Sequence, residues 1–154
     1  MAKVLVVDDD RDIRRILELV FSEFGFEVHL AGTGNEAKKR LEEQRYDLVV
    51  LDLAMPEGDG FSVLEHIREW EERPRVAVLT ARTKESDRQR AYELGAIDLT
   101  TKPFDPYELA TKLSGLMILD DEDLRKRVER DLRTSRLVQE LDRLIKRNRS
   151  DDRH

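Results

Sequence analysis

Polar side chains that could act together stand at the ends of apolar segments along the 154-residue chain. Clustered carboxylates repel one another unless a cation or bound protons compensate, and Mg²⁺ suits a carboxylate site that keeps several waters. A metal ion, a lysine ammonium and a hydroxyl would together bind a phosphoryl group and neutralise the charge that develops on its oxygens. The remaining carboxylate could then act as the nucleophile. The residues that suggest this chemistry are Asp8, Asp9, Asp10, Asp52, Thr80 and Lys102.

Each of these residues also has a plainer explanation when it is considered alone. Asp10 is well placed to cap the following helix, Thr80 could be an ordinary strand residue, and Lys102 an ordinary surface lysine. Asp52 is harder to explain in this way, because a buried unpaired carboxylate in an apolar strand is costly. The combination at successive segment ends therefore favours a functional site.

The elements that must position these residues follow a repeating pattern. Short apolar segments predict strands at 3–7, 26–31, 46–53, 75–81 and 97–100. Helical patterns lie between them and after the last one, and Gly25 is placed to end the first helix. A strand–helix unit repeated five times predicts an α/β fold with a parallel sheet covered by helices on both faces. The carboxyl ends of such strands share one edge, where ligands bind, so we expect the polar residues to converge there.

Composition excludes several classes of protein. The chain has no cysteine, which excludes disulfides, thiol catalysis and cysteine-bound zinc. No apolar run approaches the roughly 20 residues of a membrane span, and the start of the chain does not have the pattern of a signal peptide. We therefore expect a cytoplasmic protein with no membrane partner.

Charge divides the chain into two parts. Of the 34 acidic and 28 basic residues, 10 and 11 lie in residues 120–154, so this segment carries a net charge of +1 and residues 1–119 carry −7. We interpret residues 1–119 as a compact acidic domain and residues 120–154 as a charged helical tail.

Four sequence segments resemble a known family. VLVVDDDRDIRRIL, VVLDLAMPEGDG, VLTA and GAIDLTTKPF are similar, in order and spacing, to the motifs of response-regulator receiver domains of two-component signalling. The resemblance covers residues 1–119. It implies a flavodoxin-like, doubly wound, five-stranded parallel sheet with strand order 2-1-3-4-5.

The resemblance also implies a role for each matching residue. Asp52 would be the phosphoacceptor, and Mg²⁺ would be held in the acidic pocket of Asp8, Asp9 and Asp52 with the backbone carbonyl of Ala54. Thr80 and Lys102 would contact the phosphoryl group during switching. Leu99 stands where many receivers have a switching aromatic residue, which is a departure from the pattern. Pro103 would follow a cis peptide bond, and Gly60 would form the turn into the third helix.

The function implied is a phosphorylation-dependent signalling switch and not a metabolic enzyme. It would accept a phosphoryl group from a sensor histidine kinase or a phosphotransfer protein, and would catalyse only its own phosphoryl transfer and slow dephosphorylation. The output would be a changed protein contact, such as a homodimer formed through the 84–119 face or the tail.

The tail carries two apolar stripes, which lie roughly opposite each other on one straight helix. Because Thr134 and Ser135 between them could cap a new helix, we predict two short helices, at about 121–133 and 135–148. A dimerising pair, a partner-docking element and a nucleic-acid contact all stay open for the tail. The tail lacks aromatic residues for base stacking, so a nucleic-acid contact is the least favoured of these three alternatives.

Two other functions need to be weighed. A transcriptional regulator could use the cations of the tail to contact DNA. A haloacid-dehalogenase-like phosphatase could use Asp8 as its nucleophile with Thr80 and Lys102, but this arrangement would leave Asp52 without a role.

Overall fold

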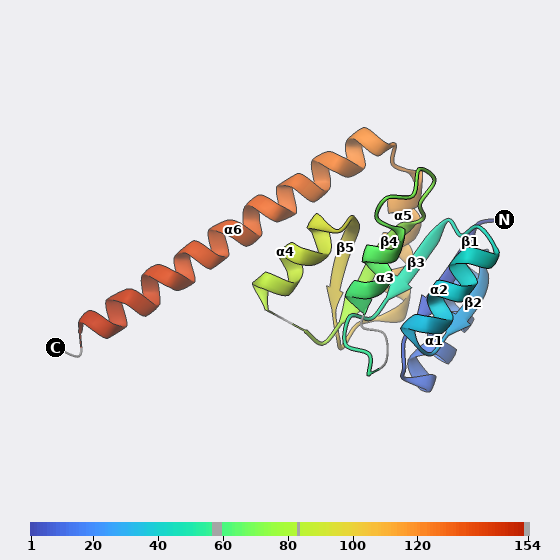
Figure 1. The fold of residues 1–154 in the computed structure, drawn as a ribbon, viewed down its shortest axis with the longest axis horizontal. Coiled ribbons are helices and arrows are strands. Elements are labelled where there is room, and N and C mark those ends of the chain that lie inside the picture. The colour runs from blue at the N-terminus through green and yellow to red at the C-terminus, as the bar shows by residue number, and fades with distance from the viewer. Residues whose placement is uncertain (57–59, 83, 153–154) are drawn as a thin grey trace.

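The sheet is parallel and has the predicted strand order. The computed structural model describes residues 1–56, 60–82 and 84–152. The strands are β1 (Lys3–Val7), β2 (Glu27–Ala31), β3 (Leu48–Leu51), β4 (Arg75–Thr80) and β5 (Ala96–Thr101). They pair in the order β2-β1-β3-β4-β5 (Figure 1).

Helices cover both faces of the sheet. They are α1 (Arg11–Glu23), α2 (Gly34–Glu43), α3 (Gly60–Ile67), α4 (Glu85–Glu93), α5 (Pro106–Ile118) and α6 (Asp121–Asp151). One apolar cluster joins α1 and α5 to the sheet, and the other joins α2, α3 and α4 to its opposite face. Both faces of the strands are therefore buried, which explains why β1 and β3 are continuously apolar and not alternating.

Local signals fix the ends of α1. The Asp10 side chain accepts hydrogen bonds from the backbone N–H groups of Asp12 and Ile13, at 2.9 and 3.3 Å, which confirms its predicted capping role. Gly25 follows the helix with a φ of 88°, a left-handed conformation that glycine adopts without steric cost. The chain therefore turns directly from α1 into β2.

The tail is one helix of 31 residues, and the prediction of two helices was wrong. The Thr134 hydroxyl donates to the backbone carbonyl of Arg130 at 3.1 Å, so it bonds back within α6 and does not cap a new helix. The prediction rested on the opposite placement of the two apolar stripes and on Thr134 and Ser135 as possible caps between them. In fact the first half of α6 packs on the domain while the second half projects beyond α4 (Figure 1), so no break is needed.

The first half of α6 is held against α4 and β5 by polar and apolar contacts. Leu124 is buried, and Val128 and Leu132 pack on the apolar cluster that contains Leu99. Three side-chain hydrogen bonds add to this packing: Tyr92 Oη to Asp131 Oδ2 at 3.0 Å, Arg127 to Asp98 at 2.9 Å and Gln89 to Gln139 at 2.9 Å. The predicted domain division at residue 119 falls at the loop between α5 and α6 and stays a prediction. No helix in the described ranges is long and apolar enough to cross a membrane.

Candidate functional site

The polar residues predicted to converge are gathered at one edge of the sheet. Backbone hydrogen bonds continue the parallel ladder past the strand ends: Asp8 N–H to the Ala31 carbonyl at 3.1 Å, Asp52 N–H to the Val7 carbonyl at 2.9 Å and Lys102 N–H to the Thr80 carbonyl at 2.9 Å. Asp8, Asp52 and Lys102 are thereby each hydrogen-bonded to the last residue of an adjacent strand. The side chains of Asp8, Asp52 and Lys102 consequently meet.

Lys102 bridges two buried carboxylates. Its Nζ lies 2.7 Å from Asp8 Oδ2 and 3.1 Å from Asp52 Oδ2. Asp8 and Asp52 are only 2% and 4% exposed, so this ammonium group supplies the positive charge that buried carboxylates require. The remaining oxygens accept backbone hydrogen bonds at 2.9 Å, Asp8 Oδ1 from Asp10 and Asp52 Oδ1 from Ala54.

The environment shifts the ionisation of both Asp8 and Lys102. Burial raises the pKa of Asp8, although the hydrogen bond from Lys102 works in the opposite direction. Burial lowers the pKa of Lys102, but the hydrogen bond and the charges of Asp8 and Asp52 outweigh burial and leave that pKa raised. The pocket therefore favours the charged form of Lys102 and disfavours the ionised form of Asp8.

The acidic cluster has the composition of a site for a hard cation. Oxygens of Asp8, Asp9 and Asp52 all lie within 4.8 Å of one another, and Asp9 is exposed at the mouth of the pocket. Three carboxylates face one ammonium group, so the site retains negative charge that a divalent cation would balance. Ala54, which is also exposed, lies beside this cluster through its N–H bond to Asp52.

Arg14 supports the acidic loop and was not identified from the sequence. Its guanidinium donates from Nη1 to the backbone carbonyls of Asp8 and Asp9, at 2.8 and 3.1 Å. These bonds fix the path of the chain that presents both carboxylates. An arginine in the first turn of α1 is the only sequence signal for this contact, and it does not distinguish Arg14 from its neighbours Arg11 and Arg15.

Thr80 and Leu99, the other two predicted switch residues, lie in different surroundings. Thr80 is fully buried at the end of β4, and its hydroxyl oxygen accepts a hydrogen bond from the Arg82 backbone N–H at 3.1 Å. Leu99 is 9% exposed and lies in the apolar cluster on which α6 packs. Leu99 therefore belongs to the core and not to the polar pocket.

Gly60 and Pro103, the two residues predicted to have structural roles, both lie where their residue type is needed. A Cβ on Gly60 would lie 2.7 Å from Leu53 Cα and closer still to the Asp52 carbonyl oxygen, so the start of α3 can approach the Asp52 segment only through glycine. The Lys102–Pro103 peptide bond is cis, as predicted. Residues 57–59 of the motif before Gly60 lie outside the described residues.

Comparison with known proteins agrees with this arrangement. Residues 4–114 match the model of the response regulator receiver domain. The chain belongs to this family. Among curated relatives, the receiver is 37% identical over 115 residues to the transcriptional regulatory protein SrrA of Staphylococcus aureus, covering 75% of this chain and 47% of SrrA. The chain thus matches only about half the length of that relative.

Solved receiver structures are similar over most of this chain. The non-phosphorylated receiver domain of HemR from Leptospira biflexa superimposes with a TM-score of 0.73 at 32% identity, covering 78% of this chain and 97% of that one. TrrA of Thermotoga maritima, crystallised in complex with Mg²⁺ and BeF, gives a TM-score of 0.67 at 34% identity, covering 75% of this chain and 99% of TrrA. All of α6 lies beyond the matched family region, which ends at residue 114.

Proposed function

We propose that this receiver is a phosphorylation-dependent signalling switch that accepts a phosphoryl group on Asp52 from a sensor histidine kinase or a phosphotransfer protein. The observation that carries the proposal is the placement of Asp52 beside the Lys102 ammonium and within 4.8 Å of two further carboxylates. Such a pocket offers a nucleophile together with groups that neutralise a phosphoryl dianion. The membership of the receiver family supports the same assignment.

The proposed step is a phosphoryl transfer from a phosphohistidine. A carboxylate oxygen of Asp52 attacks phosphorus, a P–O bond forms, and the P–N bond breaks with its electron pair going to the imidazole nitrogen. Lys102, 3.1 Å from Asp52, would stabilise the negative charge that develops on the phosphoryl oxygens. A water molecule would later hydrolyse the acyl phosphate and return Asp52 to its carboxylate form.

Asp8, Asp9, Asp52 and the carbonyl of Ala54 would hold Mg²⁺. The all-oxygen donor set fits this ion, and TrrA was crystallised with it. Bound Mg²⁺ would supply positive charge to the phosphoryl oxygens. The chain's own groups orient the site: Arg14 fixes the loop that presents Asp8 and Asp9, and the Ala54 N–H orients Asp52.

The proposed switch links the pocket to the face that α6 covers. The Thr80 hydroxyl would leave the Arg82 N–H and donate to the phosphoryl group, and Leu99 would fill the space that Thr80 vacates. Because Val128 and Leu132 pack on the cluster that contains Leu99, this movement would change how α4, β5 and α6 contact one another. The output would be an altered protein contact in the cytoplasm.

The alternative functions have weaker support. The phosphatase hypothesis assigns no role to Asp52. Asp52 nevertheless shares Lys102 with Asp8 in the same pocket. DNA contact through the tail is weakened because Arg143 and Lys146 pair with acidic residues of α6 itself, at 3.4 and 2.8 Å. SrrA is named a transcriptional regulator, but this chain matches only 47% of it.

Covalent labelling tests the proposal. We expect incubation with acetyl phosphate and Mg²⁺ to add one phosphoryl group to the intact chain, detected by mass spectrometry at neutral pH. Asp52→Asn should abolish the added mass. Asp47→Asn is the matched control, since Asp47 is exposed at the opposite end of β3 and its loss should leave labelling unchanged. Labelling that survives in Asp52→Asn, or catalytic turnover of a phosphate ester that depends on Asp8, would refute the assignment.

A further inference from the structure

The second half of α6 carries an apolar face that nothing in the described ranges covers. Its five large apolar side chains are between 45% and 66% exposed: Leu137, Val138, Leu141, Leu144 and Ile145. Beyond the contact between Gln89 and Gln139, the helix continues alone past α4 (Figure 1). A solitary amphipathic helix is marginal in water, so a partner that buries this face would stabilise it.

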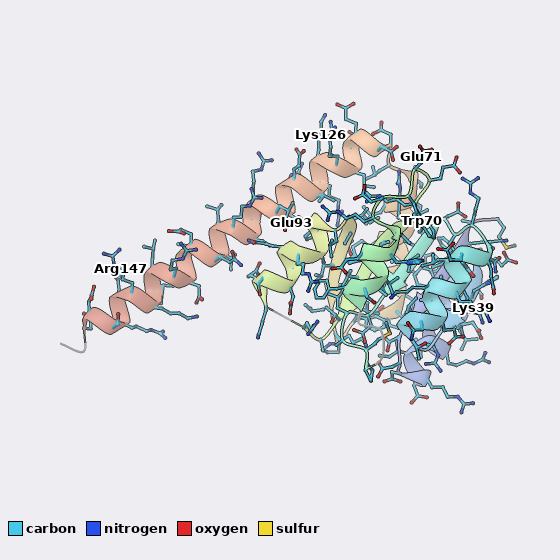
Figure 2. The ribbon with its side chains drawn as sticks, viewed as in Figure 1. Lys39, Trp70, Glu71, Glu93, Lys126 and Arg147 are labelled. Carbon is cyan, nitrogen blue, oxygen red and sulfur yellow. The ribbon has the colours of Figure 1, made fainter. Side chains whose placement is uncertain are left out.

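The uncovered face is accessible to a partner while α6 stays docked. The docked face contains Leu124, Val128 and Ser135. At 100° per residue, the centre of the uncovered face is rotated by about 120° from the centre of the docked face. Figure 2 shows Arg147 on the part of α6 that projects beyond α4. A second helix could therefore lie along residues 137–148 without displacing α4.

The spacing of this face is that of a helix-pairing seam. Leu137, Leu141, Leu144 and Asn148 follow one another at intervals of four, three and four residues, which places them in one line along the helix. Val138 and Ile145 border the line on one side. Glu140 and Arg147 border it on the other side, so one border of the line is apolar and the other is charged.

We propose that the occupant of this seam is the same segment of a second copy of the chain, running antiparallel. A two-fold axis between residues 142 and 143 then sets Leu141 against Leu144 of the second copy. The same axis sets Glu140 against Arg147 of the second copy, and by symmetry Arg147 against Glu140. The apolar border pairs in the same way, with Val138 against Ile145.

Charge complementarity selects this orientation. In the antiparallel pair both bordering charges meet an opposite charge across the seam, whereas a parallel pair would set Glu140 beside Ile145 of the second copy. The antiparallel arrangement also keeps the two receiver domains at opposite ends of the helix pair. The seam is about three turns long, smaller than a standard interface, so the dimer should dissociate on dilution. This inference goes beyond the proposed signalling function and concerns the unphosphorylated chain.

Sedimentation velocity of the full chain over a concentration series tests the proposal. The wild-type protein should pass from monomer to dimer as concentration rises. Glu140→Arg should set two arginines against each other at both ends of the seam, and Arg147→Glu should set two glutamates against each other. Each variant alone should weaken dimerisation at least about tenfold. Mixing the two variants should restore the dimer, because a chain with arginine at both border positions then meets a chain with glutamate at both.

A matched control separates pairing from simple loss of helix. Lys146→Glu removes the intrahelical ion pair with Asp142 but lies on the side of α6 away from the seam, so this variant should dimerise like the wild type. A wild-type chain that stays monomeric would overturn the proposal and leave the face to a different partner. Unchanged dimerisation of Glu140→Arg and Arg147→Glu, or a mixture of the two that fails to associate, would also overturn it.

Discussion

The Lys102 ammonium lies 2.7 Å from Asp8 Oδ2, although β3 and β4 separate their strands in the sheet. The lysine side chain therefore reaches across the ends of two strands and closes the carboxyl edge of the sheet. Without it, Asp8 and Asp52 would be buried carboxylates with no cation in the part of the pocket that the structure describes. This contact makes the site a determinant of stability as well as of chemistry.

Lys102→Met should destabilise the protein in metal-free buffer. Removing one partner of a buried ion pair leaves an uncompensated charge, which costs about 3 kcal/mol. Urea unfolding followed by circular dichroism in EDTA at pH 7 measures the effect. Lys39→Met is the control, because Lys39 is exposed on α2 and its loss should change the free energy of unfolding by less than about 0.5 kcal/mol. Equal stability of the two variants would mean that Lys102 does not support the acidic pocket.

Asp8 should give the stability of the metal-free protein a characteristic pH dependence. Burial raises the pKa of Asp8 in the folded state, so the folded protein binds this proton more tightly than the unfolded chain does. The resulting stabilisation is present below the unfolded pKa and is lost as pH rises through the raised folded pKa. The wild type should therefore gain stability relative to Asp8→Asn as the pH falls from 7 to 4.5. A constant difference between their urea midpoints over this range would contradict the prediction.

Mg²⁺ should stabilise the wild type in a manner that depends on Asp9. An ion that binds only the folded state raises the free energy of unfolding as its concentration rises above Kd. Because Asp9 is exposed, Asp9→Asn should leave the metal-free stability nearly unchanged and should remove most of the gain from added Mg²⁺. Thermal unfolding with a Mg²⁺ titration measures both quantities. An equal gain in the variant and the wild type would exclude Asp9 as a ligand.

Substitution by alanine should lower the free energy of unfolding at Gly60 and raise it at Gly115. A Cβ at Gly60 would collide with the backbone of Asp52 and Leu53, so Gly60→Ala should cost about 1–3 kcal/mol and impair labelling of Asp52. A Cβ at Gly115, in α5, meets nothing within 4 Å, and Gly115→Ala should stabilise the helix by about 0.5–1 kcal/mol. Chemical unfolding of both variants makes the comparison. A tolerated Gly60→Ala would show that the approach of α3 to Asp52 is not tight.

The sequence was sufficient to predict the sheet because its signals are local. Apolar runs, the Asp10 cap and Gly25 each act within a few residues, and the order of the strand ends predicted that Asp8, Asp52 and Lys102 would meet. The support from Arg14 was missed because it depends on side-chain reach to backbone carbonyls, which leaves no periodic pattern. The single α6 helix was missed because Thr134 and Ser135, which favour helix N-caps, also occur inside helices, where Thr134 bonds back to the Arg130 carbonyl.

Asp98 should stabilise the docking of α6 on the receiver domain. It is only 3% exposed on β5 and pairs with Lys112 of α5 at 2.8 Å and with Arg127 of α6 at 2.9 Å. Asp98→Asn removes the negative charge that both cations share, so we expect a loss of about 1–3 kcal/mol and faster hydrogen exchange in the first half of α6. Asp121→Asn is the control, because Asp121 pairs with Arg75 at 3.2 Å but its side chain is fully exposed. Such exposed pairs contribute less than about 1 kcal/mol, so exchange in α6 should then stay close to that of the wild type. Equal exchange in both variants would mean that apolar packing of Leu124, Val128 and Leu132, and not the buried ion pair, holds α6 on the receiver.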